Sequence, residues 1–569
     1  MGTNRRELLL AGAGLAAGLL SSSQARAQTA LATIGDGPDW TVLVSRVEGR
    51  LALVEWPLES CLASTGRGDC AAFFASARNP YFLGDHPALT QTLGWVDAWV
   101  NKPSERVLEA VSAADIAAAI RFARDYGVRL VVKGGGHSYT GGSNAAGSLL
   151  IWTRQMNAVE MHDAFTPMGV DAGPVSAVSV GAGAMWGEVY RKVCAGAGRY
   201  VQGGGCLTVG VAGLIQSGGF GSFSKTFGTA AASLLEAEVV TADGAVRVVN
   251  AVRDPELFFA LKGGGGGTFG VVTRVTLRTH DMPATIGAVF AEISARSDEA
   301  YRVLVARVME FYAEALHNPH WGEQIGFRPD NSLRISMLCQ GMSQGEVESL
   351  WAPFWTWLRD RPEDYEFPNP TVIVLEGRRF WDPDLLKTLP GVVLTDDRPG
   401  ADRDRIFWAG DREQSGQFLH AYASAWAPAA SLDPASRGAL VDGLYEASRY
   451  WSLTLHVNKG LAGASNAVRE RVRTETATNP VVADSFALAI CGAEGGPAYP
   501  GVPGFEPDLG LARRQVERVR AAMAAFKARV PAKGSYLAEA DYFEADWEDA
   551  FWGSSLRRLQ RAKAAYDPQ

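Results

Sequence analysis

Two glycine-rich stretches constrain this chain more than any other feature. VVKGGGHSYTGG, at residues 131–142, places three glycines directly before His137, and GGGCLTVGVAGLIQSGGFGSFSKTFG, at residues 203–228, places three before Cys206. Glycine lets a backbone approach a rigid group without a Cβ in the way, and successive N–H groups in such a turn can point at one anion. We therefore expect the two turns to hold a planar, electrophilic cofactor, with an imidazole and a thiol placed to attach it covalently from two sides.

Each stretch alone allows a simpler interpretation. The first can be a glycine-rich loop with a buried histidine, and a lone cysteine beside glycines is usually a small buried residue. A nicotinamide-binding domain is disfavoured, because no GxGxxG opens a helix after the first strand of a βαβ unit. The run GGGGGTFG at residues 263–270 follows an expected helix and precedes an expected strand, which is the reverse of that order.

The segments around the turns predict an α+β domain over residues 99–281. A helix with Ser112 and Asp115 as a capping box ends near Gly127, and a buried strand over 128–133 leads into the first turn. A second helix covers 185–198, and a hairpin over 236–249 turns at Asp243 and Gly244. Another helix begins after Asp254, and a strand follows the third glycine run.

A second domain is expected over residues 282–530. Residues 324–340 predict a hairpin and residues 345–360 an amphipathic helix, so we expect an antiparallel sheet backed by helices. The strand over 451–458 alternates cleanly, which gives it one apolar and one polar face. The polar face, which either lines a cavity or faces water, consists of Ser452, Thr454, His456 and Asn458.

The net charge of the chain restricts its expected binding partners, and its N-terminal sequence indicates its cellular compartment. The 569 residues include 54 Lys and Arg against 62 Asp and Glu, a net charge of −8, which argues against nucleic acid or an anionic membrane as the main partner. The first 27 residues predict an export signal that resembles the twin-arginine type, because they contain Arg5-Arg6, an apolar run over 8–20 and Ala25-Arg26-Ala27. An ordinary N-terminal helix is the alternative. We expect a periplasmic or secreted protein without stable membrane insertion. The oligomeric state is unknown from the sequence.

The cysteines fit an oxidising compartment. Cys61 and Cys70 flank a short polar loop within the expected N-terminal segment 28–98, and a disulfide between them is the prediction, with two free thiols as the alternative. No CxxC pair and no His/Cys cluster has zinc spacing, so no metal site is expected.

Several motifs together resemble a known family. The two glycine stretches, the string DPELFFALKGGGGGTFGVVT and the C-terminal string from Gly534 resemble the p-cresol methylhydroxylase-type FAD-binding domain of the vanillyl-alcohol oxidase superfamily. The match is closest to berberine-bridge-enzyme-like oxidases and runs from about Asn79 to the end, with residues 531–569 returning to the FAD-binding domain. The resemblance implies bicovalent FAD, bonded at the 8α-methyl by His137 and at carbon 6 by Cys206. The positions expected to contact FAD are Gly134, Gly135, Gly136, His137, Ser138, Gly141, Cys206, Val209, Gly210, Gly213, Gly218, Gly219, Gly221 and Val272.

The same resemblance implies an oxidation at the flavin. The family's Tyr-x-Asn-Tyr-x-Asp-like string reads YLAEAD here, with Ala538 and Glu539 as departures, and Tyr536 and Glu539 are the first candidates for the base. The polar face that contains His456 and Asn458 is the second candidate, with His456 as a base or as a hydrogen-bond donor to the substrate. The family position that governs oxygen access is Val209, and valine there implies an oxidase that forms hydrogen peroxide.

We expect a small sugar-like, phenolic or alkaloid-like substrate that is oxidised at a C–OH group, with a C–N or activated C–H group as alternatives. A dehydrogenase using a quinone or another acceptor, or a ligand-binding flavoprotein without turnover, are the competing functions.

Overall fold

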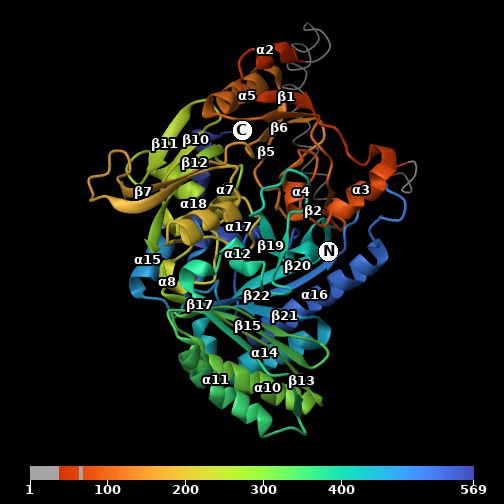
Figure 1. The fold of residues 1–569 in the computed structure, drawn as a ribbon, viewed down its shortest axis with the longest axis vertical. Coiled ribbons are helices and arrows are strands. Elements are labelled where there is room, and N and C mark those ends of the chain that lie inside the picture. Colours follow the sequence, from red (N-terminus) through yellow and green to blue (C-terminus); the bar gives the residue numbers. More distant parts are fainter. Residues whose placement is uncertain (1–37, 63–67, 569) are drawn as a thin grey trace, which may run out of the picture.

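A computed structural model describes residues 38–62 and 68–568, and Figure 1 shows how their elements are arranged. The expected export signal at 1–27 lies outside these residues. The first domain is built on two sheets. One has the strand order β1 (Arg50–Leu53), β4 (Arg106–Glu109), β6 (Ser148–Trp152) and β5 (Arg129–Lys133), and its β4–β6 and β5–β6 pairs are parallel.

Helix α5 (Ala113–Tyr126) packs on this sheet and ends as predicted at Gly127, whose φ is +67°. Ser112 caps its start, because the Ser112 hydroxyl accepts from the backbone N–H of Asp115 at 3.2 Å. The predicted capping box is wrong in one respect. The Asp115 carboxylate does not bond back to Ser112 but accepts from the backbone N–H groups of Glu48, Gly49 and Val111, at 2.7–3.2 Å, which ties the start of β1 to the helix.

The second sheet carries the second glycine stretch at its edge. Its order is β11 (Val246–Asn250), β10 (Leu234–Val240), β12 (Val271–Asp281), β8 (Val175–Gly181) and β7 (Val159–Phe165), with β9 (Arg199–Val201) pairing β12. The predicted hairpin is confirmed as β10 and β11. Helices α6 (Trp186–Tyr190), α7 (Val211–Gln216) and α9 (Pro255–Leu261) share one hydrophobic core with it.

The second domain is a large sheet. Its order is β16 (Tyr365–Glu366), β13 (Thr285–Ala295), β15 (Ser332–Gln340), β14 (Trp321–Phe327), β21 (Leu453–His456), β22 (Ser485–Gly495), β20 (Gln417–Pro428), β2 (Thr92–Trp95) and β3 (Trp99–Val100), with β17 (Thr371–Glu376) pairing β13. The expected antiparallel sheet is confirmed, and β2 from the N-terminal segment joins it in parallel with β20.

Four helices back the large sheet, as expected. They are α10 (Asp298–Phe311), α11 (Gln344–Arg359), α14 (Arg437–Tyr450) and α16 (Leu509–Arg529). Three of them, α10, α11 and α14, lie at the bottom of Figure 1, and α16 lies at mid-height on the right. Apolar residues of these helices and of the strands form one continuous core. Because helices cover this face, the opposite face of β14 and β21 is left to meet the first domain.

Smaller elements connect the two domains. The chain between β17 and β20 contains α12 (Pro383–Leu386), the hairpin β18 (Val393–Thr395) and β19 (Ile406–Trp408), and α13 (Asp411–Gln414). Between β21 and β22 lies α15 (Asn466–Glu475), and α8 (Ser224–Phe227) ends the second glycine stretch.

The C-terminal segment packs on the first domain. It contains α17 (Trp547–Trp552) and α18 (Leu556–Tyr566). Arg558 forms an ion pair with Glu256 of α9 at 2.9 Å, and the Tyr566 hydroxyl donates to Asp254 at 2.8 Å.

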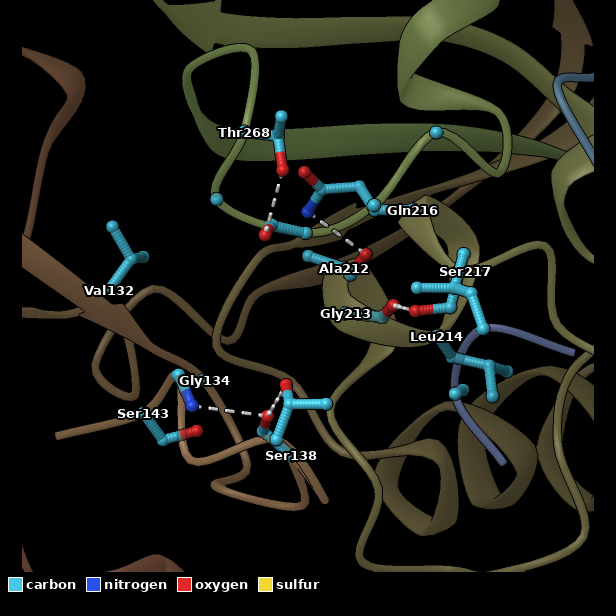
Figure 2. Close-up of a pocket in the computed structure, with 18 of the residues that line it drawn as sticks. Val132, Gly134, Ser138, Ser143, Ala212, Gly213, Leu214, Gln216, Ser217 and Thr268 are labelled. Carbon is cyan, nitrogen blue, oxygen red and sulfur yellow. Dashed lines mark hydrogen bonds between the residues drawn. The ribbon is translucent and has the colours of Figure 1, made fainter. Parts of the chain in front are cut away.

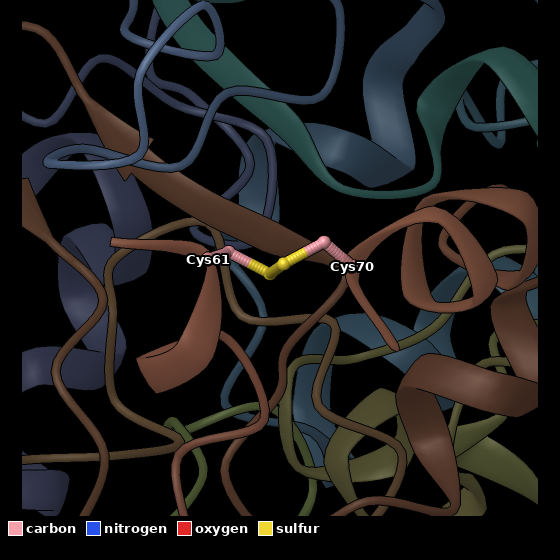
Figure 3. Close-up of a disulfide and its surroundings, with 2 residues drawn as sticks. All are labelled: Cys61 and Cys70. Carbon is pink, nitrogen blue, oxygen red and sulfur yellow. A yellow bond between two sulfur atoms is a disulfide. The ribbon is translucent and has the colours of Figure 1, made fainter. Parts of the chain in front are cut away.

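The N-terminal segment is fastened by a disulfide. Cys61 and Cys70 are bonded, with their Cα atoms 5.6 Å apart, and join the 3-10 helix η1 (Glu59–Cys61) to helix α3 (Gly68–Ser76) (Figure 3). This segment also holds α2 (Trp40–Val44) and α4 (Pro80–Gly84). Among the described helices, none is both long and apolar enough to cross a bilayer.

Candidate active site

A cavity of about 1860 Å³ lies between the two domains, with both glycine turns on its walls. Figure 2 shows Val132 of β5 and the turn with Gly134 and Ser138 on one side, and Ala212 and Gly213 of α7 on the other. The volume exceeds the roughly 300–1,000 Å³ of a typical small-molecule pocket. It is large enough for an extended cofactor together with a substrate.

Some glycines are required because the two turns touch. A Cβ on Gly135 would lie 2.7 Å from the backbone nitrogen of Gly210, so these two residues pack backbone against backbone. Gly205 and Gly213 are different, because a Cβ at either position would meet nothing within 4 Å although both residues line the cavity. Glycine there leaves room on the cavity side, which is the arrangement expected where a ligand approaches the main chain.

The structure brings most of the predicted cofactor positions to the cavity. Those that line it are Gly134, Gly135, Gly136, His137, Ser138, Cys206, Val209, Gly210, Gly213 and Val272. The remaining predicted positions, Gly141, Gly218, Gly219 and Gly221, do not. Gly141 packs on the ring of Trp99, and Gly221 packs on a main-chain carbonyl, so these glycines shape the loops behind the wall.

His137 and Cys206 meet at one hydroxyl group. The Thr208 Oγ1 atom lies 3.2 Å from His137 Nε2 and 3.5 Å from Cys206 Sγ. Burial lowers the pKa of His137 to about 4, so its imidazole is neutral and keeps a free electron pair. The Cys206 thiol also donates to the carboxylate of Asp411, with Sγ and Oδ2 3.3 Å apart. The two side chains predicted to attach the cofactor therefore lie side by side on one wall.

The opposite wall comes from the large sheet and the C-terminal segment. All four predicted catalytic residues, Tyr536, Glu539, His456 and Asn458, line the cavity. Burial and the nearby Lys459 hold the pKa of His456 well below its usual range, so its ring is neutral. The buried Oδ1 atom of Asn458 has no hydrogen-bond partner, which leaves it to a ligand.

Tyr536 and Glu539 are less free than predicted. The Tyr536 hydroxyl accepts from the backbone N–H of Gly219 at 3.3 Å, and burial, with Glu539, raises its pKa well above the usual range. Glu539 forms an ion pair with Lys459. Tyr536 therefore supports the second glycine turn and Glu539 is held in an ion pair, which leaves His456 as the remaining candidate with a ring nitrogen that can accept a proton.

Three residues of the site were not found from the sequence. Thr208 and Asp411 contact Cys206 as described, and Glu323 of β14 lines the cavity and accepts from the Ser222 hydroxyl. Glu323 has a φ of +76°, which is unusual for this residue type, and burial raises its pKa. Only Thr208 had a signal, since it stands two residues after Cys206 in the glycine stretch.

Comparison with known proteins names the fold and the cofactor. A family described as "FAD binding domain" matches residues 104–250, and one described as "Berberine and berberine like" matches residues 535–569. FAD-linked oxidoreductase malF of Malbranchea aurantiaca is 28% identical over 561 residues, which cover 93% of this chain and 88% of that protein.

Solved structures share the whole fold. The VAO-type flavoprotein MtVAO615 of Myceliophthora thermophila C1 superposes with a TM-score of 0.73 at 23% identity, covering 93% of both chains. Glucooligosaccharide oxidase of Acremonium strictum, described with a 6-S-cysteinyl, 8α-N1-histidyl FAD, has a TM-score of 0.61 at 19% identity and covers 90% of this chain and 97% of that one.

The fold and the family matches define this chain as a flavoprotein oxidoreductase. It is similar to FAD-linked oxidoreductases, its C-terminal segment matches the family described as "Berberine and berberine like", and it shares its fold with VAO-type and BBE-like flavoproteins. The cavity fits FAD. Gly205 and Gly213 leave open space along the main chain, and a neutral imidazole and a thiol lie together on one wall.

Proposed function

We propose that this chain carries FAD attached to both His137 and Cys206 and uses it to oxidise a C–OH group of a small, polar, sugar-like molecule. The observation that carries the proposal is the meeting of His137 and Cys206 at Thr208. Positions 8 and 6 of the flavin ring lie on the same ring edge, so two attachments require two side chains on one wall. Phenolic and alkaloid-like substrates, and C–N or C–H oxidation, are the alternatives.

Bound FAD supplies an acceptor for the hydride that leaves the substrate carbon. The chain's own residues supply the rest. His456 accepts the hydroxyl proton, since a neutral imidazole that faces the cavity can take it. Asn458 offers its unpaired Oδ1 atom to a substrate hydroxyl, and the charged pair of Lys459 and Glu539 makes this end of the cavity polar. This polarity supports a sugar-like substrate over an apolar one.

We propose dioxygen as the acceptor that reoxidises the flavin, forming hydrogen peroxide. Val209, the position that the family resemblance connects with oxygen access, lines the cavity. A quinone-dependent dehydrogenase is the second candidate, and peroxide formed under air separates the two.

Acid denaturation tests the attachment. The unmutated chain should keep its yellow colour on the protein, His137→Ala and Cys206→Ala should each keep it through the remaining bond, and the double variant should lose it. The unmutated chain, with a panel of sugars, phenols and alkaloids, should then form peroxide with a sugar. Colour released from the unmutated chain would refute bicovalent attachment, and a panel in which nothing bleaches the flavin would favour a binding protein without turnover.

Export to the periplasm or the medium through a twin-arginine signal at residues 1–27 is also part of the proposal. The Cys61–Cys70 disulfide supports it, because disulfides persist in oxidising compartments. Cell fractionation of the full chain, with and without Arg5→Lys and Arg6→Lys, tests it.

A further inference from the structure

Asp411 contacts the sulfur of Cys206 from outside both glycine stretches. It begins helix α13, in the connection between β17 and β20, and its Oδ2 atom accepts from Cys206 Sγ at 3.3 Å. The same connection is fixed to the cysteine turn, since the Trp408 indole donates to the carbonyl of Gly205 at 2.8 Å. The carboxylate is thus held against the thiol by the fold.

The thiol needs a proton acceptor in order to react. The thiolate is the nucleophilic form of cysteine, but burial and the neighbouring Asp411 carboxylate raise the pKa of Cys206 well above its usual range. Cys206 is therefore protonated before it reacts, and no thiolate is present in advance. The proton must leave while the sulfur attacks, which is the work of a general base within hydrogen-bond reach.

We propose that Asp411 is the base that takes the thiol proton when Cys206 attaches to the flavin ring. The inference rests on the proposed bicovalent attachment. The S–H bond breaks and its proton goes to Asp411 Oδ2, while the sulfur electron pair forms a bond to a ring carbon that loses its hydrogen as a proton. The two electrons left on the ring pass to dioxygen, which is reduced to hydrogen peroxide.

The other groups near the sulfur do not fit this role. Thr208 is a hydroxyl whose oxygen already lies between Cys206 and His137, and His137 is used for the second attachment. The other titratable groups near Cys206 are His137, which meets it at Thr208, and Tyr81, Tyr139 and Tyr190, whose pKa values are affected by the charge of Cys206. Burial lowers the pKa of His137 to about 4 and raises those of the three tyrosines above their usual range. Burial raises the pKa of Asp411 to about 6, so among these described groups it alone titrates near neutral pH.

Asp411→Asn tests the proposal in the full chain. Asparagine keeps the size and an acceptor oxygen but cannot take the proton. Glu413→Gln is the matched control, because Glu413 lies on the same helix and pairs with Arg78 at the surface. Each chain is isolated free of flavin and mixed with FAD in air. The Cys206 and His137 bonds are then counted separately by mass spectrometry of the two peptides, over time and between about pH 5 and about pH 9.

The expected result is specific to one bond. In Asp411→Asn the Cys206 bond to the flavin should form at least about 100-fold more slowly, and the His137 bond should form at the normal rate. The rate for Cys206 should then rise with pH, because hydroxide replaces the missing base. In the unmutated chain and the control, the rate for Cys206 levels off above about pH 6. A carboxylate with a purely structural role would not change this pH profile.

The opposite results are equally clear. A Cys206 bond that forms in Asp411→Asn at the control rate and with the control pH profile overturns the role of Asp411. A Cys206 peptide without flavin in the unmutated chain refutes bicovalent attachment, and the inference falls with it. If Asp411→Asn takes up flavin at neither site, Asp411→Glu is the deciding variant. Its longer side chain keeps a carboxylate, so it should restore a measurable Cys206 bond. If the His137 bond forms in Asp411→Glu but the Cys206 bond does not, the proposal is rejected.

Discussion

Glycine at position 213 gives a direct test of how the cavity is filled. A methyl group there would meet nothing within 4 Å of the protein, yet it would point into the space proposed for the flavin. Gly213→Ala should therefore leave the yield of folded chain unchanged, because alanine suits a helix better than glycine. Flavin binding should weaken about 10-fold or more, since overpacking costs about 1–3 kcal/mol.

Gly438 of α14 is the matched control for this substitution. It is also a helical glycine with open space around its missing Cβ, but it lies away from the cavity. Titration with FAD gives the result in chains that also carry His137→Ala and Cys206→Ala and therefore bind the flavin without covalent bonds. Equal affinity for FAD in Gly213→Ala and Gly438→Ala would show that the cofactor does not approach α7.

The strand β21 places the most suitable base at its end. His456 is the last residue of the strand and pairs with Gln324 of β14 and Leu488 of β22, so its position is fixed from both sides. His456→Gln should slow the reduction of the flavin by substrate about 100-fold or more, because the proton acceptor is lost, while flavin content stays unchanged.

Anaerobic stopped-flow bleaching of the flavin measures this step. Thr454→Ser is the control, because Thr454 lies on the same face of β21 but does not line the cavity. Unchanged bleaching in His456→Gln would move the base to Glu323 or Glu539. Since the pKa of His456 is held well below its usual range, the rate in the unmutated chain should not fall as the pH decreases from about 8 to about 6 through protonation of this ring.

Elements governed by local signals were predictable. The cap at Ser112, the glycine stop at Gly127, the hairpin of β10 and β11 and the alternation in β21 all depend on residues a few positions apart. The two glycine turns were also readable, because their function requires several special residues in one short string.

Contacts between distant segments were not predictable. Asp411 lies 205 residues from Cys206 in the chain and occupies a short helix without any motif. Glu323 looks like an ordinary strand residue until its backbone angle and its contact with Ser222 are known. Similarly, nothing local in β2 shows that it joins the large sheet beside β20. Site residues that act through such long-range contacts can be recognised only from the three-dimensional structure.

The two domains and the N-terminal segment are joined by charges that converge on Asp85. Its carboxylate contacts Arg154 of the first domain at 2.9 Å, and Arg398 and Arg405 of the connection before β20 at 2.8 Å and 2.7 Å. Arg154 is only 4% exposed in its side chain. Burial by itself would raise the pKa of Asp85, but the three guanidinium groups together hold it below the usual range. This contact should therefore stabilise the assembled fold.

Asp85→Asn should lower the free energy of unfolding by about 2–3 kcal/mol at neutral pH. This is less than the roughly 3–5 kcal/mol for breaking a fully buried pair, because Asp85 is partly exposed and its arginines retain Glu188 and Asp396. A group whose pKa is lower in the folded than in the unfolded chain stabilises at pH values above its unfolded pKa of about 3.9, and loses that contribution as the pH falls through the folded value. The difference between the two chains should thus be complete at neutral pH and should shrink below about pH 4.

Thermal unfolding across this pH range measures the difference in stability. Asp97→Asn is the control, because Asp97 pairs with Arg513 at the surface and the loss of this pair should leave Tm unchanged. A difference for Asp85→Asn that is absent at neutral pH, or that grows on acidification, would mean that the three arginines do not stabilise the contact between the domains.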